Sequence, residues 1–127
     1  MDLSKLRFMP SHEWAAIAGD IVTVGITQYA VDQLTDVTHL QLPKVGAAVM
    51  AGAPFGEIES VKAVFDLNSP VNGTVAEKNM IVEKDPALVT ADPYGAGWMI
   101  RVKLAAGATV DHLLTHEQYE KQIAEAH

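Results

Sequence analysis

The alternation of apolar and polar residues predicts short β-strands along most of the chain. Residues 21–26 are rich in β-branched side chains, and residues 37–42 and 98–104 alternate between apolar and polar positions. Glycine, proline and asparagine separate these runs, as is typical of turns. Many short strands divided by turns predict a mostly β sandwich or barrel.

Two segments carry helix signals. Thr27 can cap a short helix predicted over residues 28–34. Thr115 and Gln118 form a capping-box pattern that opens a C-terminal helix. Residues 85–97 are predicted to form a long ordered loop with at most a short helical turn, because two Asp-Pro pairs disfavour helix at the residue before each proline.

The most informative stretch places a lysine between two strand-like arms. Apolar residues alternate with charged ones over residues 55–61, and residues 63–65 are apolar again. Turn-forming residues close the segment at 68–70. Lys62 is therefore predicted to lie at or beside the tip of a hairpin. Asn72-Gly73, a strong hairpin signal, predicts a second tight turn.

A lysine presented in this way is a candidate for covalent attachment of a carrier cofactor. Biotin and lipoate are the two carriers that use such a lysine. Biotin sites have methionine on both sides of the lysine, whereas Val61 and Ala63 flank Lys62. The stretch Glu59-Ser60-Val61-Lys62-Ala63 instead resembles a lipoylation site.

Length and composition restrict the remaining possibilities. The chain has 127 residues, which suits one domain spanning residues 1–127, and its 49% hydrophobic and 20% charged residues are typical of a globular protein. The absence of cysteine excludes disulfides and thiolate metal sites. A net charge of −7 opposes nucleic-acid binding. No apolar run approaches the roughly 20 residues of a membrane helix, and residues 1–10 do not resemble a secretory signal.

Six short motifs occur in order along nearly the whole chain, and together they resemble the glycine cleavage system H protein family. They are Ser11-His12-Glu13-Trp14, Val24-Gly25-Ile26-Thr27 with Tyr29-Ala30, Leu42-Pro43-x-x-Gly46, Gly56-x-x-Glu59-Ser60-Val61-Lys62-Ala63, Ser69-Pro70-Val71-x-Gly73 and Asp92-Pro93-Tyr94-Gly95-x-Gly97-Trp98. Gln33, Thr90 and Ala96 depart from residues common in the family. These departures concern details of a pocket or a partner contact.

The resemblance implies a barrel-sandwich hybrid, or hammerhead, fold like that of lipoyl domains, with short helices and a C-terminal helix. It implies that lipoate is attached covalently to Lys62. The family's role is to carry the aminomethyl group of glycine from a pyridoxal-phosphate glycine decarboxylase (P protein) to a tetrahydrofolate-dependent aminomethyltransferase (T protein). Dihydrolipoyl dehydrogenase (L protein) then reoxidises the arm, and the carrier itself catalyses none of these steps.

The resemblance also implies roles for particular residues. Those that define the lipoylation site are Glu59, Ser60, Val61, Ala63 and Gly73. Those that line a cleft for the loaded arm are Ser11, Glu13 and Asp66. A carboxylate beside the amine of that group is physically reasonable, because the hydrogen bond between them is charge-assisted. A lipoate ligase or a lipoyl/octanoyl transferase is the implied modifying enzyme.

Other interpretations of these residues stay open. The chain could instead be a lipoyl relay protein that supplies 2-oxoacid dehydrogenases, or a scaffold whose Lys62 is never modified. Lysine in a turn is usually solvated surface, and Glu59 is equally explained as an acid at a strand end. His12 is interpreted as a loop histidine rather than a catalytic one. Four further histidines, His39, His112, His116 and His127, show no metal-ligand pattern, so no metal is expected.

The cellular location follows only from the class of protein. A bacterial cytoplasmic location is expected, or the mitochondrial matrix if the chain is a processed eukaryotic one. Neither nucleic acid nor a membrane is expected as a partner.

Overall fold

The computed structural model describes residues 3–34 and 36–125, which form two antiparallel sheets. The larger sheet has the strand order β1-β2-β3-β9-β8-β5. Its strands are β1 (Arg7–Phe8), β2 (Glu13–Ala18), β3 (Ile21–Ile26), β9 (Ile100–Leu104), β8 (Gly73–Lys78) and β5 (Ala48–Val49). The smaller sheet, with the order β4-β6-β7, contains β4 (Val37–Gln41), β6 (Pro54–Ser60) and β7 (Val64–Asn68).

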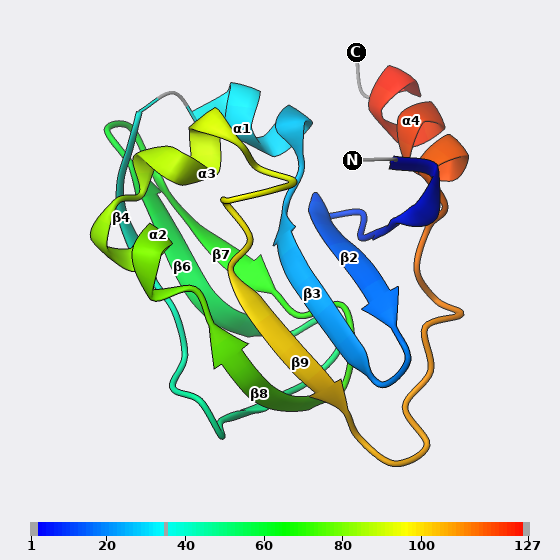
Figure 1. Cartoon of the computed structure of the whole chain (residues 1–127). Helices are drawn as coiled ribbons and strands as arrows, with labels where there is room; N and C mark the ends of the chain where they lie inside the picture. The colour runs from blue at the N-terminus through cyan, green and yellow to red at the C-terminus, as the bar shows by residue number, and fades with distance from the viewer. Residues whose placement is uncertain (1–2, 35, 126–127) are drawn as a thin grey trace.

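Short helices cover the ends of the sheets (Figure 1). A 3₁₀ turn, η1, spans Leu3–Lys5, and the α-helices are α1 (Gln28–Leu34), α2 (Met80–Lys84), α3 (Ala87–Ala91) and α4 (His116–Glu125). In Figure 1 the smaller sheet lies behind the larger one, and α4 lies beside the N-terminal segment. The mostly β architecture with short helices and a C-terminal helix confirms the predicted fold class.

The main hydrophobic core brings together buried side chains from both sheets. Val24 and Val102 of the larger sheet and Ile58 and Leu67 of the smaller one are all 1% exposed or less. Burial alternates along β6 and β8, because successive side chains of a strand point to opposite faces. The predicted half-buried strands therefore bury their apolar faces against each other.

A second, smaller cluster lies where α4 meets the N-terminal strands. Leu6, Phe8, Trp14 and Tyr119 form it, and each is 3% exposed or less. The indole of Trp14 packs so closely on Gly25 that a Cβ there would lie 2.6 Å from the ring. Trp14 also donates a hydrogen bond to the Pro93 carbonyl (3.0 Å).

The segment over residues 85–97 contains α3, a helix of five residues that is little longer than the short helical turn allowed by the prediction. Pro86 stands at the N-cap of α3 with φ −60°, a value already suited to helix, so this Asp-Pro pair starts a helix. The second Asp-Pro pair follows α3 and ends it.

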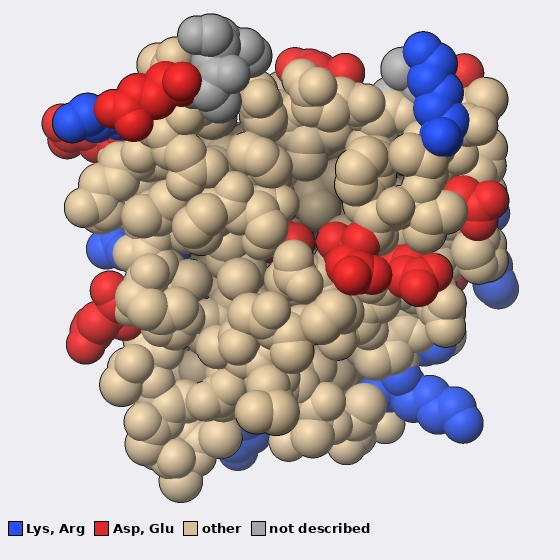
Figure 2. Space-filling view, turned by 180° about the vertical axis from the view of Figure 1, so that it is seen from behind, with Lys and Arg blue, Asp and Glu red and all other residues tan. Residues whose placement is uncertain are grey.

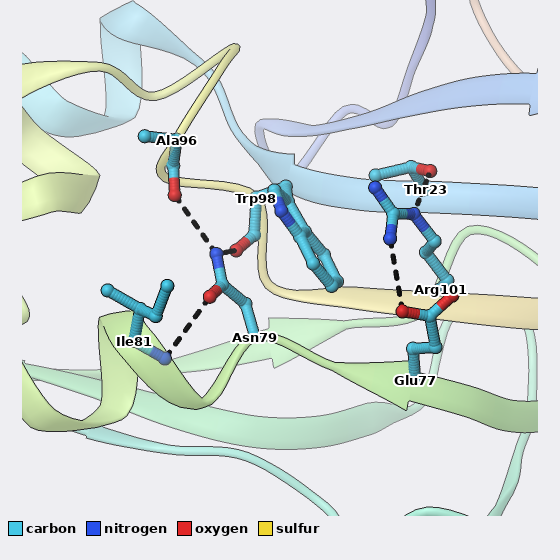
Figure 3. Close-up of polar contacts among 7 residues, drawn as sticks. All are labelled: Thr23, Glu77, Asn79, Ile81, Ala96, Trp98 and Arg101. Carbon is cyan, nitrogen blue, oxygen red and sulfur yellow. Dashed lines mark hydrogen bonds and ion pairs between the residues drawn. The ribbon is translucent and has the colours of Figure 1, made fainter.

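Asn79 connects α2 to the segment that leads into β9 (Figure 3). Its Oδ1 accepts a hydrogen bond from the Ile81 amide (3.2 Å), which caps α2. Its Nδ2 donates to the carbonyl oxygens of Ala96 (3.0 Å) and Trp98 (2.8 Å). Beside this link, the Arg101 guanidinium lies 4.0 Å from the ring centroid of Trp98. β9 begins at Ile100, two residues later than the alternation predicts.

The hairpin predicted at Asn72-Gly73 is also wrong. Gly73 begins β8, and the neighbours of β8 are β9 and β5 rather than the preceding strand. Gly73 is not among the glycines with positive φ, so it does not form the expected type of turn. A Cβ at this position would lie 2.2 Å from the Lys103 carbonyl oxygen, so glycine is required because β8 and β9 approach each other closely.

Candidate functional site

Lys62 lies in the turn between two paired strands, β6 and β7, so the predicted hairpin is present. The last paired residues are Glu59 and Val64, and Lys62 is exposed beyond them. Among the described residues, none forms an ion pair with its ammonium group. The amine is therefore accessible to another protein.

Ser60 holds this turn together from within. Its side chain is buried, with 6% of the residue exposed. The Ser60 Oγ accepts hydrogen bonds from the amides of Lys62 (3.4 Å) and Ala63 (3.3 Å), and the Ser60 amide donates to the Ala63 carbonyl (2.8 Å). The Val61 amide donates to the Asp36 carbonyl (3.2 Å). The backbone that carries Lys62 is thus tied to its own hairpin and to the segment before β4.

Apolar side chains surround Lys62 on the surface. Val61 is 68% exposed, Val64 55% and Phe65 48%. The neighbouring acids Glu57 and Glu59 are exposed as well. The hairpin therefore presents apolar contact area next to negative charge.

A cleft of about 570 Å³ opens between β7, α1 and the segment that leads into β2. Its lining residues are Ser11, His12, Glu13, Ile26, Tyr29, Ala30, Gln33, Leu34, Ile58, Phe65, Asp66, Leu67 and Asn68. Figure 2 shows one face of the molecule with a hollow near its centre, acidic side chains beside the hollow and basic side chains at the margins of the face. The structure thus brings Ser11, Glu13 and Asp66 to one cleft.

Glu13 is the buried carboxylate of this cleft. It is 2% exposed, it accepts a hydrogen bond from the Ser11 hydroxyl, and its Oε2 accepts another from the Asn68 amide (2.9 Å). Burial raises the pKa of Glu13, and these two hydrogen bonds oppose the shift. A cation bound nearby would stabilise the ionised form.

Asp66 supplies a second carboxylate from β7, and this one is exposed to solvent. It pairs in register with Glu57 of β6. Among the described residues that line the cleft, none is lysine or arginine. The electrostatics of the cleft therefore favour a small cationic group.

His12 lies at the cleft in an unusual backbone conformation. Its φ is 80°, a region that residues other than glycine rarely adopt. Its ring packs against Tyr29 (4.7 Å between centroids), and its Nδ1 is hydrogen-bonded to the Tyr119 hydroxyl (2.8 Å). Burial lowers the pKa of His12. These contacts support a structural role for the ring, in agreement with its interpretation as a loop histidine.

The sequence did not identify most of the cleft wall. The residues missed are Ile26, Tyr29, Ala30, Leu34, Ile58, Phe65, Leu67 and Asn68, together with the Asn68 amide that binds Glu13, whereas Gln33 had been connected with a pocket or a partner contact. Three residues of this group, Tyr29, Ala30 and Leu34, belong to α1, so the amphipathic pattern of that helix was the one signal available.

The residues expected to define the lipoylation site divide into two groups. Glu59, Ser60, Val61 and Ala63 surround Lys62 in the hairpin. Gly73 lies in the other sheet, paired with Val49 and Leu104. The close approach of Gly73 to β9 is enough to explain the glycine at this position, and a role beside Lys62 is not needed to explain it.

The described part of the chain holds no group of three or more His, Asp or Glu residues arranged to bind a metal ion. His127 lies outside the described residues. Within residues 3–34 and 36–125, no helix has both the length and the apolar character required to cross a bilayer.

Known proteins resemble this chain over nearly its full length. A family model described as glycine cleavage H-protein matches residues 6–126. The glycine cleavage system H protein of Rubrobacter xylanophilus is 50% identical over 120 residues, which cover 94% of this chain and 93% of that one. The H protein of Trichormus variabilis is 46% identical over 118 residues, covering 93% of this chain and 91% of that one.

A solved structure agrees with this match. The crystal structure of a glycine cleavage system H protein from Mycobacterium marinum superposes with a TM-score of 0.89 at 41% identity, and it covers 95% of this chain and 98% of that one. Agreement of both sequence and fold over this length leaves one conclusion. The chain belongs to the glycine cleavage H-protein family.

Proposed function

We propose that this chain is the lipoylated, non-catalytic carrier of the glycine cleavage system, with lipoate in amide linkage to the Nζ of Lys62. It would carry the aminomethyl group of glycine from the decarboxylase to the aminomethyltransferase. The observation that carries the proposal is the placement of Lys62, exposed in the turn of a hairpin whose backbone is held by Ser60.

The chain's own residues fit such an attachment. The lysine is free of ion pairs with the described residues, so acylation of its amine breaks no salt bridge. A rigid turn holds the amine away from the core, where a lipoate ligase or a lipoyl/octanoyl transferase can reach it. When attached, the lipoyl group supplies the redox and carrier chemistry, and the protein supplies its presentation.

The cleft is proposed as the resting place of the loaded arm. Its apolar wall from α1 and β7 would exclude water, and the carboxylates of Glu13 and Asp66 would accept charge-assisted hydrogen bonds from the amine. Ser11 would orient Glu13, to which it already donates a hydrogen bond. The protein would make these contacts with the bound arm and would not itself catalyse a reaction.

The proposed partners are the other components of the system and the enzyme that attaches lipoate. Val61, Val64 and Phe65 form exposed apolar area around the lysine, and Glu57 and Glu59 place negative charge beside it. Such a combination suits transient docking, where charge guides encounter and apolar contact holds the complex. The relay and scaffold hypotheses remain formal alternatives, and no feature of the site favours either of them.

Reconstitution tests the proposal. The lipoylated chain is combined with a glycine decarboxylase and an aminomethyltransferase, and glycine-dependent transfer to tetrahydrofolate is followed. Lys62→Arg should abolish transfer, whereas Lys44→Arg, which changes another exposed lysine, should leave it unchanged. Activity retained by Lys62→Arg, or a modified chain that supports no transfer, would exclude the proposed role.

The role of the cleft has a separate measurement. Hydrolytic loss of the aminomethyl group is followed in the isolated loaded chain after the decarboxylase has been removed. Glu13→Ala should accelerate this loss, because the amine loses a buried carboxylate partner. An unchanged rate would remove Glu13 from the proposal and leave the attachment site unaffected.

A further inference from the structure

The C-terminal helix α4 contacts two segments beside the cleft through one buried side chain, Tyr119. This residue is 3% exposed. Its hydroxyl is hydrogen-bonded both to His12 Nδ1 (2.8 Å) and to Thr27 Oγ1 (2.7 Å). The hydroxyl therefore connects two segments that are far from α4 in sequence.

These two segments are neighbours in the larger sheet, where Glu13 pairs with Ile26, and residues of both line the cleft. His12 stands between Ser11 and Glu13, which line the cleft. Thr27, with 0% exposure, caps α1 by accepting a hydrogen bond from the Ala30 amide (3.2 Å), and α1 supplies several of the residues that line the cleft. The two segments also meet directly, since the Thr27 amide donates to the His12 carbonyl (3.0 Å).

The conformation of His12 depends on its surroundings. A positive φ in a residue other than glycine is unfavourable, so it persists only where neighbouring contacts determine it. The Tyr119 hydrogen bond is one such contact, and the turn bond from the His12 amide to the Met9 carbonyl (2.9 Å) is another. Loss of the Tyr119 contact would let the segment around Glu13 relax.

Further contacts fix Tyr119 in place. Its ring stacks on Phe8 with centroids 4.8 Å apart and planes at 7°. Gln122, one turn later in α4, donates to the Pro10 carbonyl (2.9 Å), so the same helix holds the wall segment at a second point. Burial also raises the pKa of Tyr119 to about 12, so the hydroxyl stays protonated at physiological pH.

We propose that Tyr119 is a positioning residue for the arm cleft, whose hydroxyl sets the spacing between the Ser11–Glu13 segment and α1. The cleft-lining residues include no part of α4, so Tyr119 would act on the bound group only through His12 and Thr27. This inference rests on the proposed function, because it assigns to α4 the task of shaping the cleft that protects the loaded arm.

The decisive variant is Tyr119→Phe, which keeps the ring that stacks on Phe8 and removes only the hydroxyl. In the unmodified chain, amide hydrogen exchange at Thr27 and Ala30 should accelerate by at least about fivefold, because the substitution removes both hydrogen bonds of the hydroxyl and loss of one such bond corresponds to roughly this factor. In the lipoylated and loaded chain, the half-life of the aminomethyl group should shorten by about the same factor.

Ile123→Ala is the matched control. Ile123 is half-buried and packs on the same cluster as Tyr119, so its truncation loosens α4 but keeps the hydroxyl network. If α4 served only the stability of the fold, both variants would shorten the half-life in proportion to their loss of melting temperature. The proposal instead requires that Tyr119→Phe shortens it more than a control of equal or lower melting temperature.

The possible outcomes separate this inference from the proposed function. The positioning role alone would be overturned if the loaded arm is protected in the wild type and Tyr119→Phe changes neither this protection nor the amide exchange. A wild-type arm that hydrolyses as fast as in Glu13→Ala would overturn the protective role of the cleft. In that case amide exchange at Thr27 and Ala30 decides whether Tyr119 holds the two segments.

Discussion

Glu13 illustrates how one residue can be costly to the fold and still be retained. An ionised carboxylate that is 2% exposed is unfavourable unless hydrogen bonds or a counter-charge compensate its burial. The Ser11 hydroxyl and the Asn68 amide provide hydrogen bonds, and no lysine or arginine among the described lining residues provides a charge. The missing counter-charge is what a bound amine would supply.

A pH series of unfolding measurements tests the burial of Glu13. Because burial raises its pKa above the ordinary value of 4.5, Glu13 contributes stability that is complete below pH 4.5 and is lost as the pH rises through the raised pKa. The free energy of unfolding of the wild type should therefore fall relative to that of Glu13→Gln across this interval. Urea unfolding at each pH gives both values.

The comparison with Glu13→Gln cancels the other acids, which titrate equally in both proteins. A difference that is constant with pH would show that Glu13 titrates normally. A difference that grows in favour of the wild type with rising pH would show a lowered pKa, contrary to the account.

At the scale of elements, the hairpin of β6 and β7 shows what local sequence can determine. Alternation predicted the first strand, a short apolar run predicted the second, and turn residues at 68–70 closed the segment, so the position of Lys62 followed from neighbours in sequence. The capping box of α4 was equally local, and the structure contains both of its hydrogen bonds, between Thr115 and Gln118. These signals are independent of the rest of the fold.

Elements determined by distant contacts could not be predicted in this way. Asn72-Gly73 has the composition of a tight turn, but the close approach of β8 to β9 is the reason for the glycine. The helix α3 starts at Pro86. Proline is tolerated at the start of a helix but breaks a helix interior, and packing decides which of these two effects applies. In both cases the local sequence is compatible with two conformations, and tertiary contacts determine which one forms.

Ser60 gives a prediction for the hairpin. Ser60→Ala removes the Oγ that accepts hydrogen bonds from the Lys62 and Ala63 amides, so the free energy of unfolding should fall by about 1 kcal/mol. A less ordered turn should also slow enzymatic lipoylation in a timed assay with a lipoate ligase. Thr38→Ala is the control, because its hydroxyl donates to the Glu59 carbonyl outside the turn. Equal lipoylation rates in wild type and Ser60→Ala would show that the turn needs no such support.

At the scale of the whole molecule, the cleft is the feature that sequence spacing does not reveal. Its walls come from the start of β2, from α1 and from β7, and they meet only after both sheets have packed. Ser11, Glu13 and Asp66 were singled out through resemblance to a family. Their convergence on one cleft is a property of the fold, whereas their contact with a loaded arm stays a proposal.

The loaded arm should stabilise the entire fold if it rests in the cleft. A group that binds only the folded state raises the free energy of unfolding, and a hydrogen bond to a charged group suggests about 1.5–3 kcal/mol here. Thermal unfolding of the loaded and unloaded lipoylated chains measures this difference.

Two variants identify the source of such a stabilisation. Asp66→Asn should reduce it, whereas Glu57→Gln should not, because Glu57 pairs with Asp66 in register but does not line the cleft. Both substitutions remove one negative charge, so long-range electrostatics change equally. Equal melting temperatures for the loaded and unloaded wild type would contradict docking of the arm.

The central claim, that Lys62 carries lipoate, is tested most directly by intact mass and peptide mapping. The chain is produced in cells where lipoate attachment to another acceptor is verified. We predict one lipoyl group for each chain, located on the peptide that contains Lys62, with every other lysine unmodified. A bare Lys62 under these conditions, or lipoate found on a different lysine, would contradict the account.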